Sequence, residues 1–153
     1  MEQSNLSFWQ NHSVNFLEMA LQSDRREVLN NPDGFGRVGR EECGDMLEVY
    51  LMIRDGVIHT AGFETNGCLY VVACANTVTC LVQGKAVAEA MNISSEDVMA
   101  FLETLPEKEK HCADLAVAGL RAAIAEAREM ERSPWKKAYR ESKMSYGRPR
   151  PRT

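Results

Sequence analysis

One stretch decides the fold of this chain: Met46-Leu47-Glu48-Val49-Tyr50-Leu51-Met52-Ile53-Arg54-Asp55-Gly56-Val57. From Met46 to Ile53, apolar side chains recur at every second position, which is the period of a strand with one buried face. The Asp55-Gly56 pair that follows is typical of a two-residue type I′ turn, because both residues of that turn need positive φ. Val57 to Thr65 then returns as a second strand. The stretch therefore predicts an antiparallel hairpin.

Two long helices are expected after the hairpin. The segment from Cys68 to Gln83 carries no charge and precedes Gly84, a residue type common just past a helix end, so it predicts a buried helix. It lies in an uncharged stretch from Thr65 to Gly84 whose Asn and Thr side chains are too polar for a membrane span. A last helix is predicted from about His111 to Arg132, because six apolar residues share one arc of its helical wheel: Ala116, Leu120, Ala123, Ile124, Ala127 and Met130.

Shorter segments complete the expected order of elements. Near the N-terminus a helix is predicted from its apolar residues: a stripe of Val14, Leu17 and Leu21, with Phe16 and Met19. Asn30–Gly36 is dense in turn-forming residues and predicts a loop. Ser94–Asp97 resembles a capping box and begins a short helix that runs toward Glu103. The expected fold class is α+β, with a small antiparallel β-sheet of about three strands packed against helices.

The 153 residues divide by charge into a body and a tail. Residues 1–131 carry 10 Lys/Arg and 21 Asp/Glu, a net charge of −11, whereas residues 132–153 carry 8 and 1, a net charge of +7. An acidic body argues against nucleic acid as a partner, because phosphate binding needs a basic surface. We expect one domain over residues 1–132 and a basic, disordered tail over residues 133–153, where apolar periodicity ends.

The N-terminal sequence predicts the compartment and the state of the cysteines. It reads Met1-Glu2-Gln3-Ser4-Asn5, without the basic and apolar regions of a secretory signal. We therefore expect a cytoplasmic protein without membrane association. Its five cysteines would stay reduced, which favours metal or thiolate chemistry over a disulfide framework.

The hairpin is expected to bring two cysteines to one rim of the sheet. A two-residue loop pairs residue i with residue 111 − i, which places Cys43 opposite Cys68, with Asp45 at the same rim. Cys68 also begins a helix, as do His111 and Cys112, and the positive end of a helix favours a thiolate. Three thiolates with one imidazole and one carboxylate suit an iron–sulfur cluster or zinc. These five residues are the candidate metal ligands.

Other interpretations of the cysteines stay open. Cys43 and Cys68 would also suit a disulfide. Cys112 falls on the apolar side of its helix, where an ordinary buried cysteine is the alternative. Cys74 and Cys80 follow Cys68 at steps of six residues, which point in three directions around a helix, so we interpret them as core residues rather than ligands.

Five short motifs resemble, in order and spacing, a known family: the IscU-type scaffold, or NifU N-terminal domain, of iron–sulfur cluster assembly. The resemblance covers about residues 12–132. Its specificity lies in the combination of Cys-Gly-Asp, a Gly-Cys after a strand and a His-Cys at a helix start. The motifs are Glu42-Cys43-Gly44-Asp45, Phe63-Glu64-Thr65-Asn66-Gly67-Cys68, Gly84-Lys85, Leu105-Pro106 and Lys110-His111-Cys112.

The resemblance implies a SufE/NifU-like α+β fold that carries a transient [2Fe–2S] cluster. Such a protein builds the cluster from iron and from sulfur supplied by a cysteine desulfurase, then transfers it to recipient apoproteins, as a carrier rather than an enzyme. By this resemblance Cys43, Cys68 and Cys112 are the cluster ligands and His111 is an alternative ligand. Asp45 is the carboxylate that keeps the cluster labile. Zn²⁺ or Fe²⁺ is expected at such a site in the purified protein.

The sequence departs from the family pattern at two places. Leu69-Tyr70 stands where the family has Gly-Ser after the second cysteine, which makes that wall of the site bulkier. Glu109 stands where the family's chaperone-recognition stretch has a lysine, which argues against a dedicated Hsp70-type chaperone partner. Two other functions stay open: a zinc-binding persulfide acceptor for a cysteine desulfurase, and a thiol redox protein that uses Cys43 and Cys68.

Overall fold

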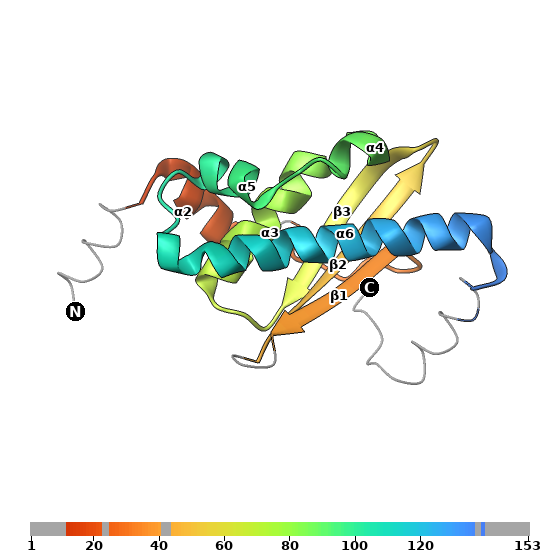
Figure 1. Ribbon diagram of the computed structural model, residues 1–153, viewed down its shortest axis with the longest axis horizontal. Helices are drawn as coiled ribbons and strands as arrows, with labels where there is room; N and C mark the ends of the chain where they lie inside the picture. Colours follow the sequence, from red (N-terminus) through yellow and green to blue (C-terminus); the bar gives the residue numbers. More distant parts are fainter. Residues whose placement is uncertain (1–11, 23–24, 41–43, 137–138, 140–153) are drawn as a thin grey trace.

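The computed structural model describes residues 12–22, 25–40, 44–136 and 139. Three strands form one antiparallel sheet in the order β1-β2-β3, and helices pack against it, which confirms the α+β class (Figure 1). The elements are α2 (Val14–Leu21), β1 (Gly34–Arg40), β2 (Asp45–Arg54), β3 (Val57–Thr65), α3 (Leu69–Val82), α4 (Val87–Ala90), α5 (Ser95–Leu102), the short 3₁₀ helix η1 (Glu107–Glu109) and α6 (Lys110–Arg132).

The β2–β3 hairpin forms as predicted, but its register shifts. Asp55 and Gly56 have φ of 53° and 77°, as the tight turn requires. The unbroken register predicts His59 opposite Met52, whereas the irregularity beside Met52 places Thr60 there. An extra residue of this kind is a β-bulge, which local alternation does not reveal. The register that would pair Cys43 with Cys68 therefore ends at the bulge, and Cys43 lies outside the described residues.

The first strand replaces part of a predicted loop. Gly34 and Gly36 belong to β1, which pairs with β2. A Cβ on Gly36 would lie 2.5 Å from both the backbone nitrogen of Ala123 and the carbonyl oxygen of Gly119. The loop prediction was wrong over Gly34–Gly36 because these glycines serve close helix–sheet contact rather than a turn.

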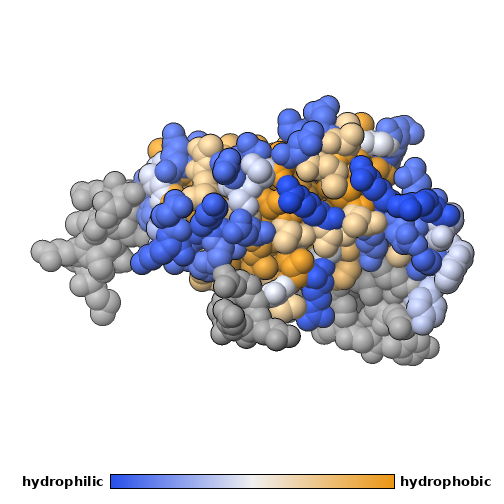
Figure 2. Space-filling view, viewed as in Figure 1, coloured by the Kyte–Doolittle hydropathy of each residue, from blue (hydrophilic) through white to orange (hydrophobic). Residues whose placement is uncertain are grey.

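The long helix α6 covers one face of the sheet (Figure 1). Its buried side chains include four that the helical wheel predicted, which are Ala116, Leu120, Ala123 and Ile124. Hydrophobic residues remain visible along the middle of the face that α6 crosses, with hydrophilic residues around them (Figure 2). Small side chains on α6 thus allow its backbone to lie close to β1.

The central helix α3 runs through the core, since ten of its 14 residues are buried. Its buried polar side chains are satisfied internally: the Asn76 amide donates to the carbonyls of Met19 and Gln22, and the Thr77 hydroxyl donates to the carbonyl of Ala73. Gly84, with φ of 88°, follows the helix end. Among the described residues, none of the helices combines the length and apolarity that a membrane span requires.

The predicted N-terminal helix forms as α2 and turns Phe16 and Met19 toward the core. Val14 and Leu21 are 78% and 57% exposed, whereas Phe16 and Met19 are buried. The Phe16 ring packs at 5.7 Å from the ring of Tyr70, which lies in the first turn of α3. Docking against α3 therefore selects the face of Phe16, and Leu17 is partly buried against the same core.

The expected boundary near residue 132 coincides with the end of α6, but helical backbone resumes soon after it. Trp135, Lys136 and Tyr139 are helical, and the Lys136 ammonium pairs with the Glu129 carboxylate on α6. This ion pair links Lys136 to α6, and the expectation of a disordered tail over residues 133–153 stays a prediction. Residues 137–138 and 140–153 lie outside the described residues.

Candidate metal centre

The candidate ligands begin three different elements. Asp45 is the first residue of β2 and is half-buried. Cys68 is the N-cap of α3, where its exposed free thiol makes no capping hydrogen bond. His111 and Cys112 lie in the first turn of α6. Cys43 lies outside the described residues, so its expected place beside Cys68 stays a prediction.

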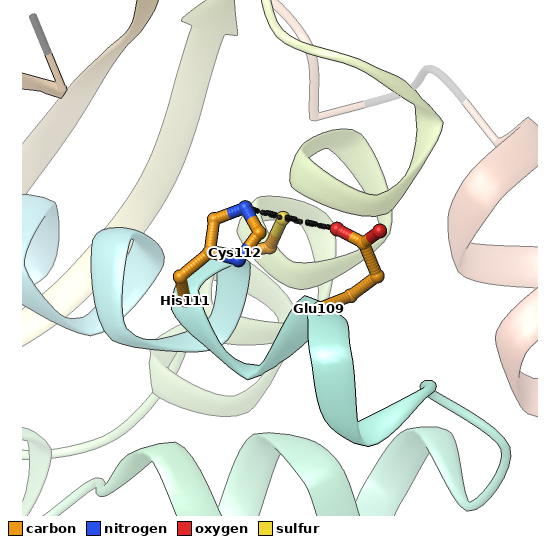
Figure 3. A group of neighbouring side chains, drawn as sticks. All are labelled: Glu109, His111 and Cys112. Carbon is orange, nitrogen blue, oxygen red and sulfur yellow. Dashed lines mark hydrogen bonds and ion pairs between the residues drawn. The ribbon is translucent and has the colours of Figure 1, made fainter. Parts of the chain in front are cut away.

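The side chains of Glu109, His111 and Cys112 point toward one another (Figure 3). The Cys112 sulfur lies 3.5 Å from Nε2 of His111 and 3.6 Å from Oε2 of Glu109. The same two nitrogen and oxygen atoms are 3.7 Å apart. The structure thus brings two of the five predicted ligands together with Glu109, a residue that stands out in the sequence only as a departure from the family pattern. Asp45 and Cys68 are not part of this group of three.

Cys112 has the environment of a neutral thiol. It is fully buried, and burial raises the pKa of its thiol well above the usual range. A thiolate at Cys74 or Cys68 and the Glu109 carboxylate raise this pKa further, as does the hydrogen bond to Glu109. The expectation that the helix N-terminus favours a Cys112 thiolate is therefore wrong for the metal-free protein, because desolvation outweighs the helix dipole. A bound cation would stabilise the Cys112 thiolate at this buried position.

The charges around the buried Cys74 come in part from residues of this centre. Cys74 is fully buried in the core, which matches the interpretation as a core residue. Burial raises the pKa of its thiol, and the charges of Cys68 and Glu109 raise it further. The wheel describes Cys74 relative to Cys68 on α3 alone and does not include α6, which packs against α3 and carries Cys112.

Asn66 fastens the start of β2 to the loop that carries Cys68. Its side-chain oxygen accepts a hydrogen bond from the backbone N–H of Met46 at 2.7 Å, and its amide donates to the carbonyl of Gly44 at 3.2 Å. Asp45 stands between these two anchored residues. One side chain thus fixes the start of β2 relative to Cys68, a role that the local sequence pattern around the asparagine does not indicate.

Of the two bulky residues Leu69 and Tyr70, the tyrosine makes aromatic contacts. The half-buried Tyr70 ring packs on Phe16 of α2 and, edge-on at 6.3 Å, on His12. The Nδ1 of His12 lies 3.2 Å from the hydroxyl of Thr104, within hydrogen-bond distance. These contacts connect the start of α3 with the segment that leads into η1 and α6. Leu69 itself is 37% exposed and lies beside the exposed thiol of Cys68.

The donor set fits a borderline transition metal. Thiolate, imidazole and carboxylate together are the ligands of zinc and of iron in oxygen- and sulfur-rich sites. Cys68 is exposed and the His111 side chain is about a third exposed, so both donors are accessible from solvent. The arrangement can therefore bind and release a metal without unfolding of the core.

Known proteins are similar to this chain in sequence. A family model described as the NifU-like N terminal domain matches residues 18–133. The iron–sulfur cluster assembly scaffold protein IscU 1 of Archaeoglobus fulgidus is 35% identical over 98 residues, which are 64% of this chain and 64% of that protein. The scaffold protein IscU of Escherichia coli K12 is 39% identical over 94 residues, 61% of this chain and 73% of that protein.

Solved structures agree on the fold. The N-terminal NifU-like protein of Brucella abortus superposes with a TM-score of 0.62 at 21% identity, over 79% of this chain and 94% of that one. At that identity the likeness shows the fold alone. The family model, in contrast, spans most of the described chain, from within α2 to the end of α6. This chain belongs to the family of NifU-like N-terminal domains.

Proposed function

We propose that this chain is a scaffold on which a transient [2Fe–2S] cluster is assembled and from which it passes to recipient apoproteins. The observation that carries the proposal is the position of a buried Cys112, with His111 beside it, at the start of a helix packed against the one that Cys68 begins. Relatives with 35–39% identity are named cluster assembly scaffold proteins, which supports the same role here.

Each proposed ligand has a distinct part in holding the cluster. Cys112 is the buried anchor, and Cys68 is the exposed thiol that sulfur from a cysteine desulfurase reaches first. Cys43 supplies the third thiolate. Asp45 and His111 supply harder or exchangeable donors, and three thiolates with such a donor hold a cluster less firmly than four. Release to an apoprotein then needs no change in the fold, so the protein acts as a carrier without turnover of its own.

Anaerobic reconstitution with ferric iron and sulfide tests this function directly, because those components form [2Fe–2S]²⁺ without an added reductant. The full chain is expected to give the visible absorption and circular dichroism of a [2Fe–2S] cluster. Cys43→Ser, Cys68→Ser and Cys112→Ser should each abolish stable assembly. Cys80→Ser is the matched control, since this half-buried thiol on α3 lies outside the proposed ligands.

Two outcomes would contradict the proposal. A colourless chain that retains one zinc after reconstitution would favour the zinc-binding persulfide acceptor. Equal loss of the cluster in Cys80→Ser and Cys68→Ser would show that the ligand set is misassigned.

A further inference from the structure

The group of Glu109, His111 and Cys112 is formed by one short segment of chain. Glu109 is the N-cap of α6 and the last residue of η1, and the other two residues lie in the first turn of α6. Their mutual positions therefore depend on local helix geometry, and they do not require Cys43 or Cys68 to be in place.

The three donor atoms have the spacing of a tetrahedral metal site. Bonds of about 2.3 Å to sulfur and about 2.0–2.2 Å to nitrogen and oxygen, at tetrahedral angles, put neighbouring donors about 3.3–3.6 Å apart. The observed separations are 3.5 Å for sulfur to nitrogen, 3.6 Å for sulfur to oxygen and 3.7 Å for nitrogen to oxygen. Each agrees with a tetrahedron to within a few tenths of an ångström, so one ion would bind all three with small side-chain movements.

The histidine is already oriented for metal binding. Its Nδ1 lies 3.2 Å from the carbonyl oxygen of Lys108, and a carbonyl can only accept, so Nδ1–H is the donor. The neutral ring then has its lone pair on Nε2, the atom that faces Cys112 and Glu109. A backbone carbonyl that fixes the tautomer in this way is a common outer-shell partner of a metal-bound histidine.

The group is reachable from outside and has an open position. The side chains of His111 and Glu109 are 35% and 20% exposed, while Cys112 forms the buried floor. Three protein donors leave the fourth tetrahedral position for water or for an incoming thiolate, the arrangement of sites that exchange a ligand rather than of closed structural sites.

We propose that Glu109, His111 and Cys112 form an entry site that binds one divalent transition-metal ion, Fe²⁺ or its stand-in Zn²⁺, before the remaining cysteines close around it. The inference rests on the proposed scaffold function and adds Glu109 as a ligand, at a position where the family pattern has a lysine. Glu109 brings a hard oxygen donor, which suits a single hydrated ion better than a finished cluster held by thiolates. It would be displaced when Cys43 and Cys68 take up the metal.

The test uses Co²⁺ as a spectroscopic probe with the full chain. The Cys43→Ser/Cys68→Ser double variant is titrated anaerobically, and it should bind one Co²⁺ with tetrahedral ligand-field bands and thiolate-to-cobalt charge transfer. Adding Glu109→Gln to that background should weaken Co²⁺ binding by about tenfold or more. Glu107→Gln is the matched control, an exposed carboxylate in the same short helix, and it should leave binding unchanged. Circular dichroism checks that each variant is folded.

Three results would overturn the entry site: no Co²⁺ binding by the folded double variant, unchanged affinity and spectrum in Glu109→Gln, or an equal effect of Glu107→Gln. Cluster reconstitution of the full chain is read separately. If the double variant binds Co²⁺ through Glu109 while the full chain forms no cluster, the entry site stands and the scaffold function fails. If the full chain forms a cluster while Co²⁺ binding is insensitive to Glu109, the scaffold function stands and the entry site fails.

Discussion

Replacing Gly36 by alanine tests the close contact between β1 and α6. The added Cβ would lie 2.5 Å from two backbone atoms of α6, the nitrogen of Ala123 and the carbonyl oxygen of Gly119, whereas ordinary contact begins near 3.4 Å. The helix must therefore retreat by about 0.9 Å, and a gap of that size loses a quarter to a half of the dispersion attraction across it. We expect Gly36→Ala to lower the free energy of unfolding by about 3 kcal/mol, which corresponds to a fall in Tm of about 9 °C.

Urea unfolding followed by circular dichroism measures this effect, with Gly39→Ala as the matched control. Gly39 lies in the same strand, but its added Cβ would meet chiefly the sulfur end of the Met46 side chain, which can rotate away. The control should therefore cost less than about 1 kcal/mol. If the two variants are equally stable, the close contact between the backbones of α6 and β1 at Gly36 is wrong.

Two further predictions concern the metal centre. Asp45→Ala should leave cluster assembly intact and slow transfer to an acceptor apoprotein several-fold, because it removes a weak hard donor; faster cluster loss than in the parent chain would contradict this role. Burial raises the pKa of the Cys74 thiol, so folding favours its protonated form. The stability this contributes is complete below the thiol's unfolded pKa of about 8.5. The free energy of unfolding should then fall as pH rises above that value, by up to about 1.4 kcal/mol per pH unit, and less steeply in Cys74→Ala. Urea unfolding at a series of pH values measures this dependence. If the free energy of unfolding falls as steeply with pH in Cys74→Ala as in the parent chain, Cys74 is not the group that titrates.

The parts of the fold that sequence predicts are those set by neighbouring residues. The Asp55-Gly56 turn, the strand β2 and the capping box of Ser94 and Asp97 all form as expected, because each depends on a few consecutive positions. The bulge beside Met52 and the strand at Gly34–Gly36 were missed. Both depend on contacts between residues distant in sequence: the bulge on the pairing of β2 with β3, and the glycines of β1 on the backbone of α6.

In the candidate site, too, the sequence predicts what neighbouring residues determine and misses what the packing of distant elements determines. His111 and Cys112 are adjacent in sequence, and the structure places them side by side. Glu109 joins them only because η1 precedes α6, and a three-residue helix has too little periodicity to be predicted. The neighbourhood of Cys74 depends on how α3 and α6 pack, which the wheel of a single helix cannot show.

The uneven burial of the donors explains how one site can both hold and release its cargo under the proposed function. Cys112 is fully enclosed, so as a thiolate it is stable only with a cation beside it, and metal loss is coupled to uptake of a proton. Cys68 is exposed and His111 is a third exposed, so an acceptor's thiolates can displace them from outside in successive steps. The bond from the metal to Cys112 breaks last, and because burial raises the pKa of Cys112, the released thiolate readily takes up a proton. Firm retention before transfer and full release at its end therefore follow from the same buried position.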